Sequence, residues 1–275
     1  KLKELPQDSY TKLLLHFKGT DGSTTITDSS PTPKTPGGVN GNTQIDTAQS
    51  KFGGSSLLLD GTDDSIDYVD SDDWYWDADF TIDCWIRAIS FASNMVICGN
   101  YSPSGTQQNL FYWDATNGIS YYNYNSGVLV DFNQGAITGW SVDTWYHVAL
   151  VRSGDNYNIY RDGVSVASVT DASAHINFSL AFYLGQRGSA GDQYWNGWLD
   201  EFRVSKGIAR WTAGFGVPSK EYTNFVSGGT DTSAPIQINA SGTSALDTIS
   251  WLDTLPTNTK VTFQTRTGAT NDTVD

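Results

Sequence analysis

The feature that most constrains this chain is a regular series of short strand-like segments between residues 51 and 206, separated by turn-forming residues. Each segment either alternates apolar and polar side chains or runs apolar throughout, and each is too short for a core helix. Examples are SSLLL, FTIDCWIRA, NLFYWD, WYHVALVR and YNIYR. About a dozen such segments predict an all-β domain in which two antiparallel sheets pack as a sandwich.

Alternation within one segment indicates which side chains form the core. In FTIDCWIRA, residues 80–88, the side chains of Phe80, Ile82 and Cys84 share one face, which we expect to point inward. Trp85 shares the opposite face. We therefore expect it to cover the outside of its sheet or to pack beneath a loop.

Several residues are expected to serve the fold. Asp162-Gly163 joins two strand-like segments and predicts a tight hairpin turn with positive φ. His147 lies inside an apolar run, which favours a packed histidine over a base or ligand. The chain has three His and no CxxC or HExxH motif, so a zinc site is not indicated. Cys84 and Cys98 both lie in apolar segments, which favours buried free thiols over a disulfide.

The charge balance excludes some partners. A net charge of −14 would repel a phosphate backbone, and no basic stripe offsets it, so nucleic-acid binding is not expected. No run of about 18 apolar residues occurs, so membrane insertion is not expected either. The sequence begins at Lys1 without a leader pattern, which favours a processed chain or a segment of a longer polypeptide.

Changes in composition divide the chain into four parts. Residues 1–9 read as an N-terminal arm, and residues 10–225 contain the strand-like segments of the sandwich. Residues 226–235, rich in small residues, read as a linker. Residues 236–275 are expected to form a partial β-rich unit, because they hold too little apolar material for a core of their own.

Three segments together resemble a known family. GWLDEFRVSKGIARWTAGFGVP, residues 197–218, predicts a closing strand, one short helical turn and a stop. With WYHVALVRSGDNYNIYRDG at 145–163 and KFGGSSLLLDG at 51–61, it resembles the laminin G-like branch of the concanavalin A-like lectin/glucanase superfamily. The opening TKLLLHFKGTDGSTTITDSS is similar to domains of phage and bacterial surface proteins. The resemblance implies a concanavalin A-like jelly roll, while function must be argued from the site.

Two adjacent carboxylates in the closing strand bear on catalysis. A glycoside hydrolase on this fold would need two carboxylates that face one cleft. Strand alternation predicts that Asp200 and Glu201 point to opposite faces and cannot flank one bond. The resemblance implies that they serve the fold, with Arg203 as the tether of one of them. The sequence therefore disfavours an enzyme.

An acidic segment offers a metal site. Nine aspartates fall between Asp60 and Asp79, and carboxylate oxygens are the ligands that calcium prefers. The best candidates for a structural calcium site are Asp60, Asp63 and Asp64, with Asp200 or backbone carbonyls completing the shell. The alternative is a solvated acidic loop, because Asp and Gly are also what tight turns require.

Aromatic side chains beside amides and carboxylates suggest a sugar site. Pyranose rings present CH patches to a flat aromatic face and hydroxyl groups to polar partners. Three segments offer this combination, with the following candidate residues: Trp74, Trp76, Tyr122, Asn123, Asp192, Gln193, Tyr194 and Trp195. The alternative is that these aromatics pack in the core or contact other proteins.

Two functions remain open at this point. The first is a non-catalytic, extracellular module, displayed on a cell or virion surface, that binds surface glycans or polysaccharide. The second is a structural subunit or decoration protein of a phage particle or filament, held by contacts with other structural subunits or within a homo-oligomer.

Overall fold

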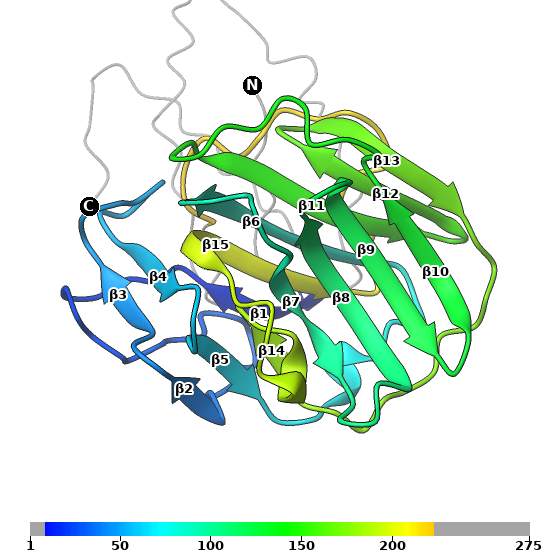
Figure 1. The fold of residues 1–275 in the computed structure, drawn as a ribbon, viewed down its shortest axis with the longest axis horizontal. Helices are drawn as coiled ribbons and strands as arrows, with labels where there is room; N and C mark the ends of the chain where they lie inside the picture. The colour runs from blue at the N-terminus through cyan, green and yellow to red at the C-terminus, as the bar shows by residue number, and fades with distance from the viewer. Residues whose placement is uncertain (1–8, 223–275) are drawn as a thin grey trace, which may run out of the picture. The chain divides into compact units, whose positions relative to one another are not determined.

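The computed structural model describes residues 9–222, and in this part of the chain two antiparallel sheets pack face to face (Figure 1). The all-β sandwich is therefore confirmed. In spatial order, the eight-stranded sheet contains β13 (Val164–Thr170), β12 (Asn156–Arg161), β11 (Tyr146–Ser153), β6 (Phe80–Ala88), β15 (Asn196–Lys206), β4 (Ser56–Asp60) and β3 (Gln44–Asp46), and β1 (Thr11–Leu15) pairs with β15.

The second sheet lies toward the viewer in Figure 1, with β8, β9 and β10 in front. In spatial order it contains β10 (Val128–Asn133), β9 (Gly118–Asn125), β8 (Gln107–Asp114), β7 (Met95–Tyr101), β14 (Phe182–Leu184), β5 (Ser65–Tyr68) and β2 (Gly38–Asn40). Two 3₁₀ turns, η1 (Asp72–Trp74) and η2 (Gly188–Ala190), lie in the connections.

The core lies between the two sheets and follows the alternation of the strands. Phe80, Ile82 and Cys84 of β6 point into it, as predicted. Cys84 and Cys98 are both buried and free, which confirms the expectation of two thiols without a disulfide. Burial raises the pKa of both thiols, so they behave as small apolar side chains.

Trp85 lies on the outer face of the eight-stranded sheet. Its ring meets that of Phe52 edge-on, with 5.9 Å between the centroids, and the Lys51 ammonium lies 3.8 Å from its centroid. Trp85 therefore packs beneath a loop, one of the two arrangements expected from the sequence. His147 is fully buried on the same outer face, which confirms its packed role.

Some expectations differ from the structure. The helical turn predicted after the closing strand is absent, because the segment after β15 lies flat against the outer face of the eight-stranded sheet. There the backbone N–H of Arg210 donates to Thr81 Oγ1 and that of Phe215 donates to the Gly163 carbonyl, so neither supports a helix. The sequence pattern also missed β2 and β3, which are three residues long and mostly polar.

The predicted arm apart from Ser9, the linker 226–235 and the unit 236–275 lie outside the described residues. Within residues 9–222, no helix is long and apolar enough to cross a bilayer.

The hairpin between β12 and β13 has the predicted geometry. Asp162 and Gly163 adopt φ angles of 48° and 78°, as a two-residue turn of the primed type requires. The carbonyl of Gly163 accepts a hydrogen bond of 2.9 Å from the N–H of Phe215. A Cβ on Gly163 would lie 1.8 Å from the Phe215 carbonyl oxygen, so this turn also fixes the segment after β15.

We expect Gly163→Ala to lower the free energy of unfolding by at least about 3 kcal/mol, because backbone strain adds to a clash with backbone. Gly154→Ala is the matched control. Gly154 also has positive φ, at 59°, but a methyl group added there would meet no atom within 4 Å. That change should cost only about 1 kcal/mol. Chemical denaturation measures both, and equal losses would contradict the role of the Phe215 contact.

Candidate functional site

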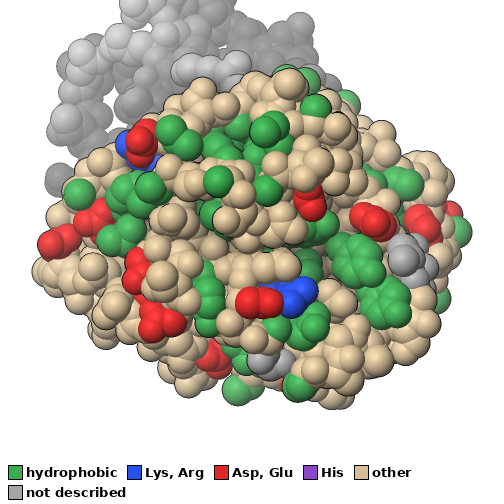
Figure 2. Space-filling view, viewed as in Figure 1, with side chains coloured by type: hydrophobic (Ala, Val, Ile, Leu, Met, Phe, Trp, Pro, Cys, Tyr) green, Lys and Arg blue, Asp and Glu red, His purple; other side chains and the backbone are tan. Residues whose placement is uncertain are grey.

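The outer face of the seven-stranded sheet carries a group of tyrosines on β8 and β9, beside an aspartate of β10. Phe111 and Tyr121 point into the core, so their neighbours Tyr112 and Tyr122 point outward. We use the name tyrosine face for the set Tyr112, Tyr122, Tyr124 and Asp131, in which the tyrosines are half-buried and the aspartate is exposed. Figure 2 shows this side of the molecule, where hydrophobic-class side chains gather over β9 and acidic ones lie beside them.

Two rings of the tyrosine face, those of Tyr122 and Tyr124, are stacked with nearly parallel planes. Tyr122 and Tyr124 lie two residues apart on β9, with 5.9 Å between their ring centroids and an interplanar angle of 12°. Tyr122 pairs with Asp131 of β10 across the ladder, so a carboxylate stands directly beside the rings. Two nearly parallel rings with a neighbouring acceptor can hold the CH face of a sugar and bind its hydroxyl groups.

Burial and neighbouring charges shift the pKa values of two polar groups on this face. Burial raises the pKa of Tyr112 to about 12, and the charges of Asp114 and Asp131 add to the shift, so its phenol remains a hydrogen-bond donor. Partial desolvation, followed by repulsion from Asp114, also raises the pKa of Asp131. Asp131 forms no ion pair within residues 9–222, which leaves its oxygens available as acceptors.

The segment before β15 contacts β7, in the same sheet as the tyrosine face. The carbonyl of Gln193 accepts a hydrogen bond of 2.8 Å from the N–H of Val96, and Val96 pairs with Tyr112. Asp192 accepts hydrogen bonds of 2.8 and 2.5 Å from Arg187. The structure therefore brings the segment from Asp192 through Tyr194 to the same sheet as Tyr122, although these residues are distant in sequence.

Three predicted tryptophans do not belong to a sugar site. Trp74, Trp76 and Trp195 are 5%, 2% and 0% exposed and lie in the core. Trp74 stacks on Phe182, with 4.6 Å between centroids, because η1 turns the acidic segment inward. The expectation that these indoles offer a face to a sugar ring is wrong, since that face is already covered by protein.

Asn123 is likewise committed to the core. It follows Tyr122, so alternation turns it inward, where it is 2% exposed and donates to His175 Nδ1 at 3.1 Å. His175 Nε2 lies 2.5 Å from the Tyr157 hydroxyl, so a neutral imidazole has a partner at each nitrogen. Burial lowers the pKa of His175 to about 4, and the positive charge of Arg152 adds to the shift.

This histidine gives the fold a pH dependence. Its folded pKa of about 4 is below the ordinary value of 6.5, so between these values the unfolded chain binds a proton that the folded chain does not. The stabilising contribution is therefore present above pH 6.5 and lost as the pH falls toward 4.

We expect the free energy of unfolding of wild type to fall by up to about 3 kcal/mol more than that of His175→Gln across this range, measured by urea unfolding. Identical pH slopes in the two proteins would contradict a neutral buried His175.

The predicted metal residues separate into two places. Asp60, Asp63 and Asp64 come together, with one oxygen of each within 4.8 Å of the others. Asp64 accepts backbone hydrogen bonds of 2.5 Å from Asn42 and 2.7 Å from Asp60. Burial, and then repulsion from Asp60 and Asp63, raises the pKa of Asp64, although the two hydrogen bonds oppose the shift. No Lys or Arg within residues 9–222 forms an ion pair with any of the three aspartates.

Asp200 lies elsewhere and is not a ligand of that group. Its carboxylate accepts the backbone N–H groups of Lys51 and Phe52 at 2.7 and 3.0 Å. Burial raises its pKa to about 7, although these two hydrogen bonds oppose the shift. Asp200 thus anchors the loop that covers the eight-stranded sheet, and its assignment to a calcium shell is wrong.

A β-bulge also overturns the expected directions of the two carboxylates. The register of β15 on β6 slips between Asp200 and Arg203, and Glu201 adopts a φ of 50°. Leu199 and Phe202 both point into the core, so Asp200 and Glu201 between them share the outer face. They were predicted to lie on opposite faces. That prediction is wrong, because the bulge inserts one extra residue into β15.

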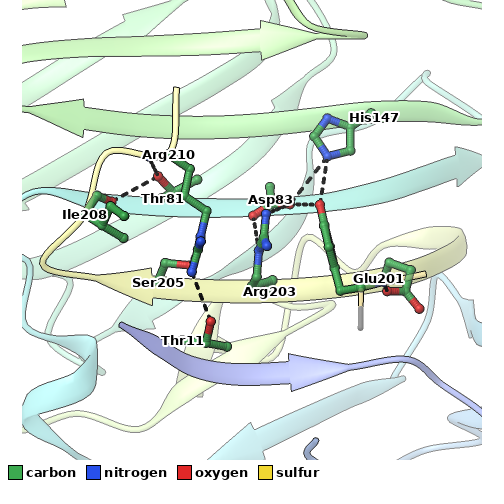
Figure 3. A network of polar contacts seen from close by, with 10 residues as sticks. Thr11, Thr81, Asp83, His147, Glu201, Arg203, Ser205, Ile208 and Arg210 are labelled. Atoms are coloured by element: carbon green, nitrogen blue, oxygen red, sulfur yellow. Dashed lines mark hydrogen bonds and ion pairs between the residues drawn. The ribbon is translucent and has the colours of Figure 1, made fainter. Parts of the chain in front are cut away.

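Both carboxylates are nevertheless unavailable for catalysis. Glu201 is 1% exposed and accepts hydrogen bonds of 2.6 Å from His16 Nδ1 and 2.8 Å from the N–H of Tyr222. Arg203, expected to tether one of the pair, instead points at Asp83 of β6, with bonds of 3.0 and 3.1 Å (Figure 3). The acidic pair and its neighbours therefore fasten strands and loops together.

Comparison with known proteins identifies the family. The family model for the concanavalin A-like lectin/glucanases superfamily, Laminin_G_3, matches residues 60–210, which is more than half of the chain. The chain belongs to this family, as the resemblance of its segments indicated. No curated protein sequence matches the chain significantly.

Several solved structures share the fold at low sequence identity. Domain 4 of AbnA, a GH43 extracellular arabinanase from Geobacillus stearothermophilus in complex with arabinotriose, is 19% identical, with a TM-score of 0.55 over 72% of this chain and 93% of that one. The binding domain of Paraclostridial Mosquitocidal Protein 1 is 16% identical, with a TM-score of 0.57 over 72% of this chain and 49% of that one.

The binding domain of Botulinum Neurotoxin DC in complex with SialylT is 14% identical, with a TM-score of 0.52 over 72% of this chain and 48% of that one. This chain thus spans about half the length of the two toxin chains. At these identities the likeness shows the fold and not the ligand.

Proposed function

We propose that this protein is a non-catalytic carbohydrate-binding module that takes surface glycans or polysaccharide on its tyrosine face. The observation that carries the proposal is the pair of nearly parallel rings of Tyr122 and Tyr124 beside the exposed carboxylate of Asp131. Flat rings with an adjacent acceptor match the alternation of CH patches and hydroxyl groups on a sugar. The burial of Asp200 and Glu201 supports a role without catalysis.

Solved structures with the same fold also support the proposal that this protein binds carbohydrate. Two of its structural neighbours were solved with carbohydrate ligands, and one of those belongs to an extracellular enzyme. An extracellular place on a cell or virion surface is consistent with such a module. The alternative function, a structural subunit of a particle, would use the same tyrosines to contact a neighbouring subunit, and it is an outcome of the test below.

We expect Tyr122→Ala and Tyr124→Ala each to weaken glycan binding about tenfold, because each change removes one ring of the stacking surface. Tyr183→Ala is the matched control, since Tyr183 is a half-buried tyrosine on the outer face of the same sheet, at β14. A glycan array identifies the ligand of the wild-type chain, and calorimetry then measures the variants.

Two results would contradict the proposal. In the first, the glycan array shows no bound glycan, analytical ultracentrifugation shows that the chain self-associates, and Tyr122→Ala abolishes this association. That result would favour the structural-subunit function. The other is equal affinity of wild type and both tyrosine variants for the glycan that the array identifies.

We further propose a structural calcium ion at Asp60, Asp63 and Asp64. Three carboxylates close together, without a basic partner within residues 9–222, form a repulsive group that a divalent cation would relieve. Asp64 is already oriented by two backbone hydrogen bonds, which leaves Asp60 and Asp63 at the surface to reach the ion.

Calcium should raise the melting temperature of the wild-type chain by about 4 °C at roughly 10 mM, because an ion that binds only the folded state stabilises it. Asp63→Asn should abolish the shift. Asp70→Asn is the control, since it removes the same charge from an exposed position in the same acidic segment. Differential scanning calorimetry with and without chelator measures the shift, and a shift of the same size in all three proteins would refute the assignment.

A further inference from the structure

We propose a second carbohydrate site on the opposite side of the sandwich, in a groove that takes an uncharged oligosaccharide. The groove has a volume of about 450 Å³ and lies on the outer face of the eight-stranded sheet, over β11, β12 and β13. Its size falls within the range of small-ligand sites. We call it the polar groove, defined by Ser153, Asn156, Asn158, Ser168, Thr170 and Trp211.

The sheet register builds the floor of the polar groove. Asn156 lies between Ser153 of β11 and Thr170 of β13, and Asn158 lies beside Ser168 of β13. Directly opposed residues of an antiparallel sheet share a face, so these side chains form two parallel rows of hydroxyl and amide groups. Such rows on adjacent strands give a rigid surface rather than a flexible loop.

The floor keeps hydrogen-bonding groups available for a ligand. The carbonyl oxygens of Asn156 and Asn158 accept bonds from Thr170 and Ser165, at 2.9 and 3.3 Å, which fixes the orientation of both amides. Within residues 9–222, neither amide nitrogen donates a hydrogen bond to protein, so both point their donors at the groove or at solvent. Fixed amide donors beside hydroxyl groups match the oxygen atoms of a sugar.

The wall of the groove is an indole held in place from behind. Trp211 stacks on Phe215, with 3.9 Å between centroids and an angle of 7° between the rings. Both rings pack on a small apolar cluster that includes Val151 and Tyr160. An aromatic wall that is already ordered loses little entropy when a ligand binds against it.

The charge of the lining selects the class of ligand. None of the residues that line the groove is Lys, Arg, Asp or Glu, although the chain as a whole carries a net charge of −14. An anionic sugar would find no cation there to offset its desolvation, and a cationic peptide would find no carboxylate. Hydroxyl and amide groups beside an indole therefore fit a neutral oligosaccharide.

The two sites can be tested separately because they lie on different sheets. We suggest titrating the ¹⁵N-labelled full chain with neutral oligosaccharides of arabinan, β-glucan, mannan and xylan, and following the amide and indole signals. The expected result is a saturable shift of the side-chain amides of Asn156 and Asn158 and of the indole N–H of Trp211 with at least one of these oligosaccharides.

Two variants then test the groove by occlusion. Ser168→Trp should weaken binding of that oligosaccharide at least tenfold, because a large side chain on the exposed edge strand fills the groove. Val164→Trp is the control, since Val164 is exposed on the same strand but does not line the groove. Equal affinities of the two variants would overturn the proposal.

The titration also distinguishes the groove from the tyrosine face. Shifts confined to the residues around Tyr122 and Tyr124 would overturn the groove and leave the proposed function standing. Shifts confined to the groove would support the present inference and leave the tyrosine face to be tested with the glycan that the array identifies. No shift at Asn156, Asn158 or Trp211 with any of the four oligosaccharides would overturn the groove.

Discussion

The buried ion pair between Arg203 of β15 and Asp83 of β6 is the interaction on which the rest of the structure depends. It joins the two central strands of the eight-stranded sheet on the side away from the core. Burial alone would raise the pKa of Asp83, but the charge and hydrogen bonds of Arg203, together with the contact with His147, outweigh it and hold this pKa well below its usual range. The Tyr222 hydroxyl donates to the same carboxylate, so the segment after β15 closes over the pair. Removing one partner of such a pair costs about 3–5 kcal/mol, because the other charge is left buried.

The bulge at Glu201 makes this arrangement possible. A non-glycine residue at positive φ costs about 1–3 kcal/mol, so it persists only where its surroundings fix it. Here the Glu201 carboxylate binds His16, just after β1, and the backbone N–H of Tyr222, at the end of the described chain. The strain is thereby offset by contacts that connect the first and last described segments through one side chain.

Period-two alternation was enough to predict the inward face of β6, and the Asp162-Gly163 pair was enough to predict its hairpin. Alternation gave the wrong directions for the side chains of Asp200 and Glu201. One inserted residue in a strand reverses the faces to which the preceding side chains point. It also could not show that the Trp74 ring would stack on the ring of Phe182, which is more than a hundred residues away in sequence. Tyr112 and Asp131 were missed, although they are the outward members of apolar segments that flank the segment of Tyr122. The polar groove left no signal, since Ser, Asn and Thr are equally typical of turns.

The attachment of both ends of the domain to β15 has a mechanical consequence. β1 pairs with β15 along its length, and Tyr222 is fixed to Asp83 and Glu201 beside the same strand. A pulling force applied between β1 and Tyr222 would therefore run through β15 and its hydrogen bonds. Neither the seven-stranded sheet nor the strands β12 and β13 lie on the path of this force. The tyrosine face and the strands that form the floor of the polar groove would therefore keep their shape under tension.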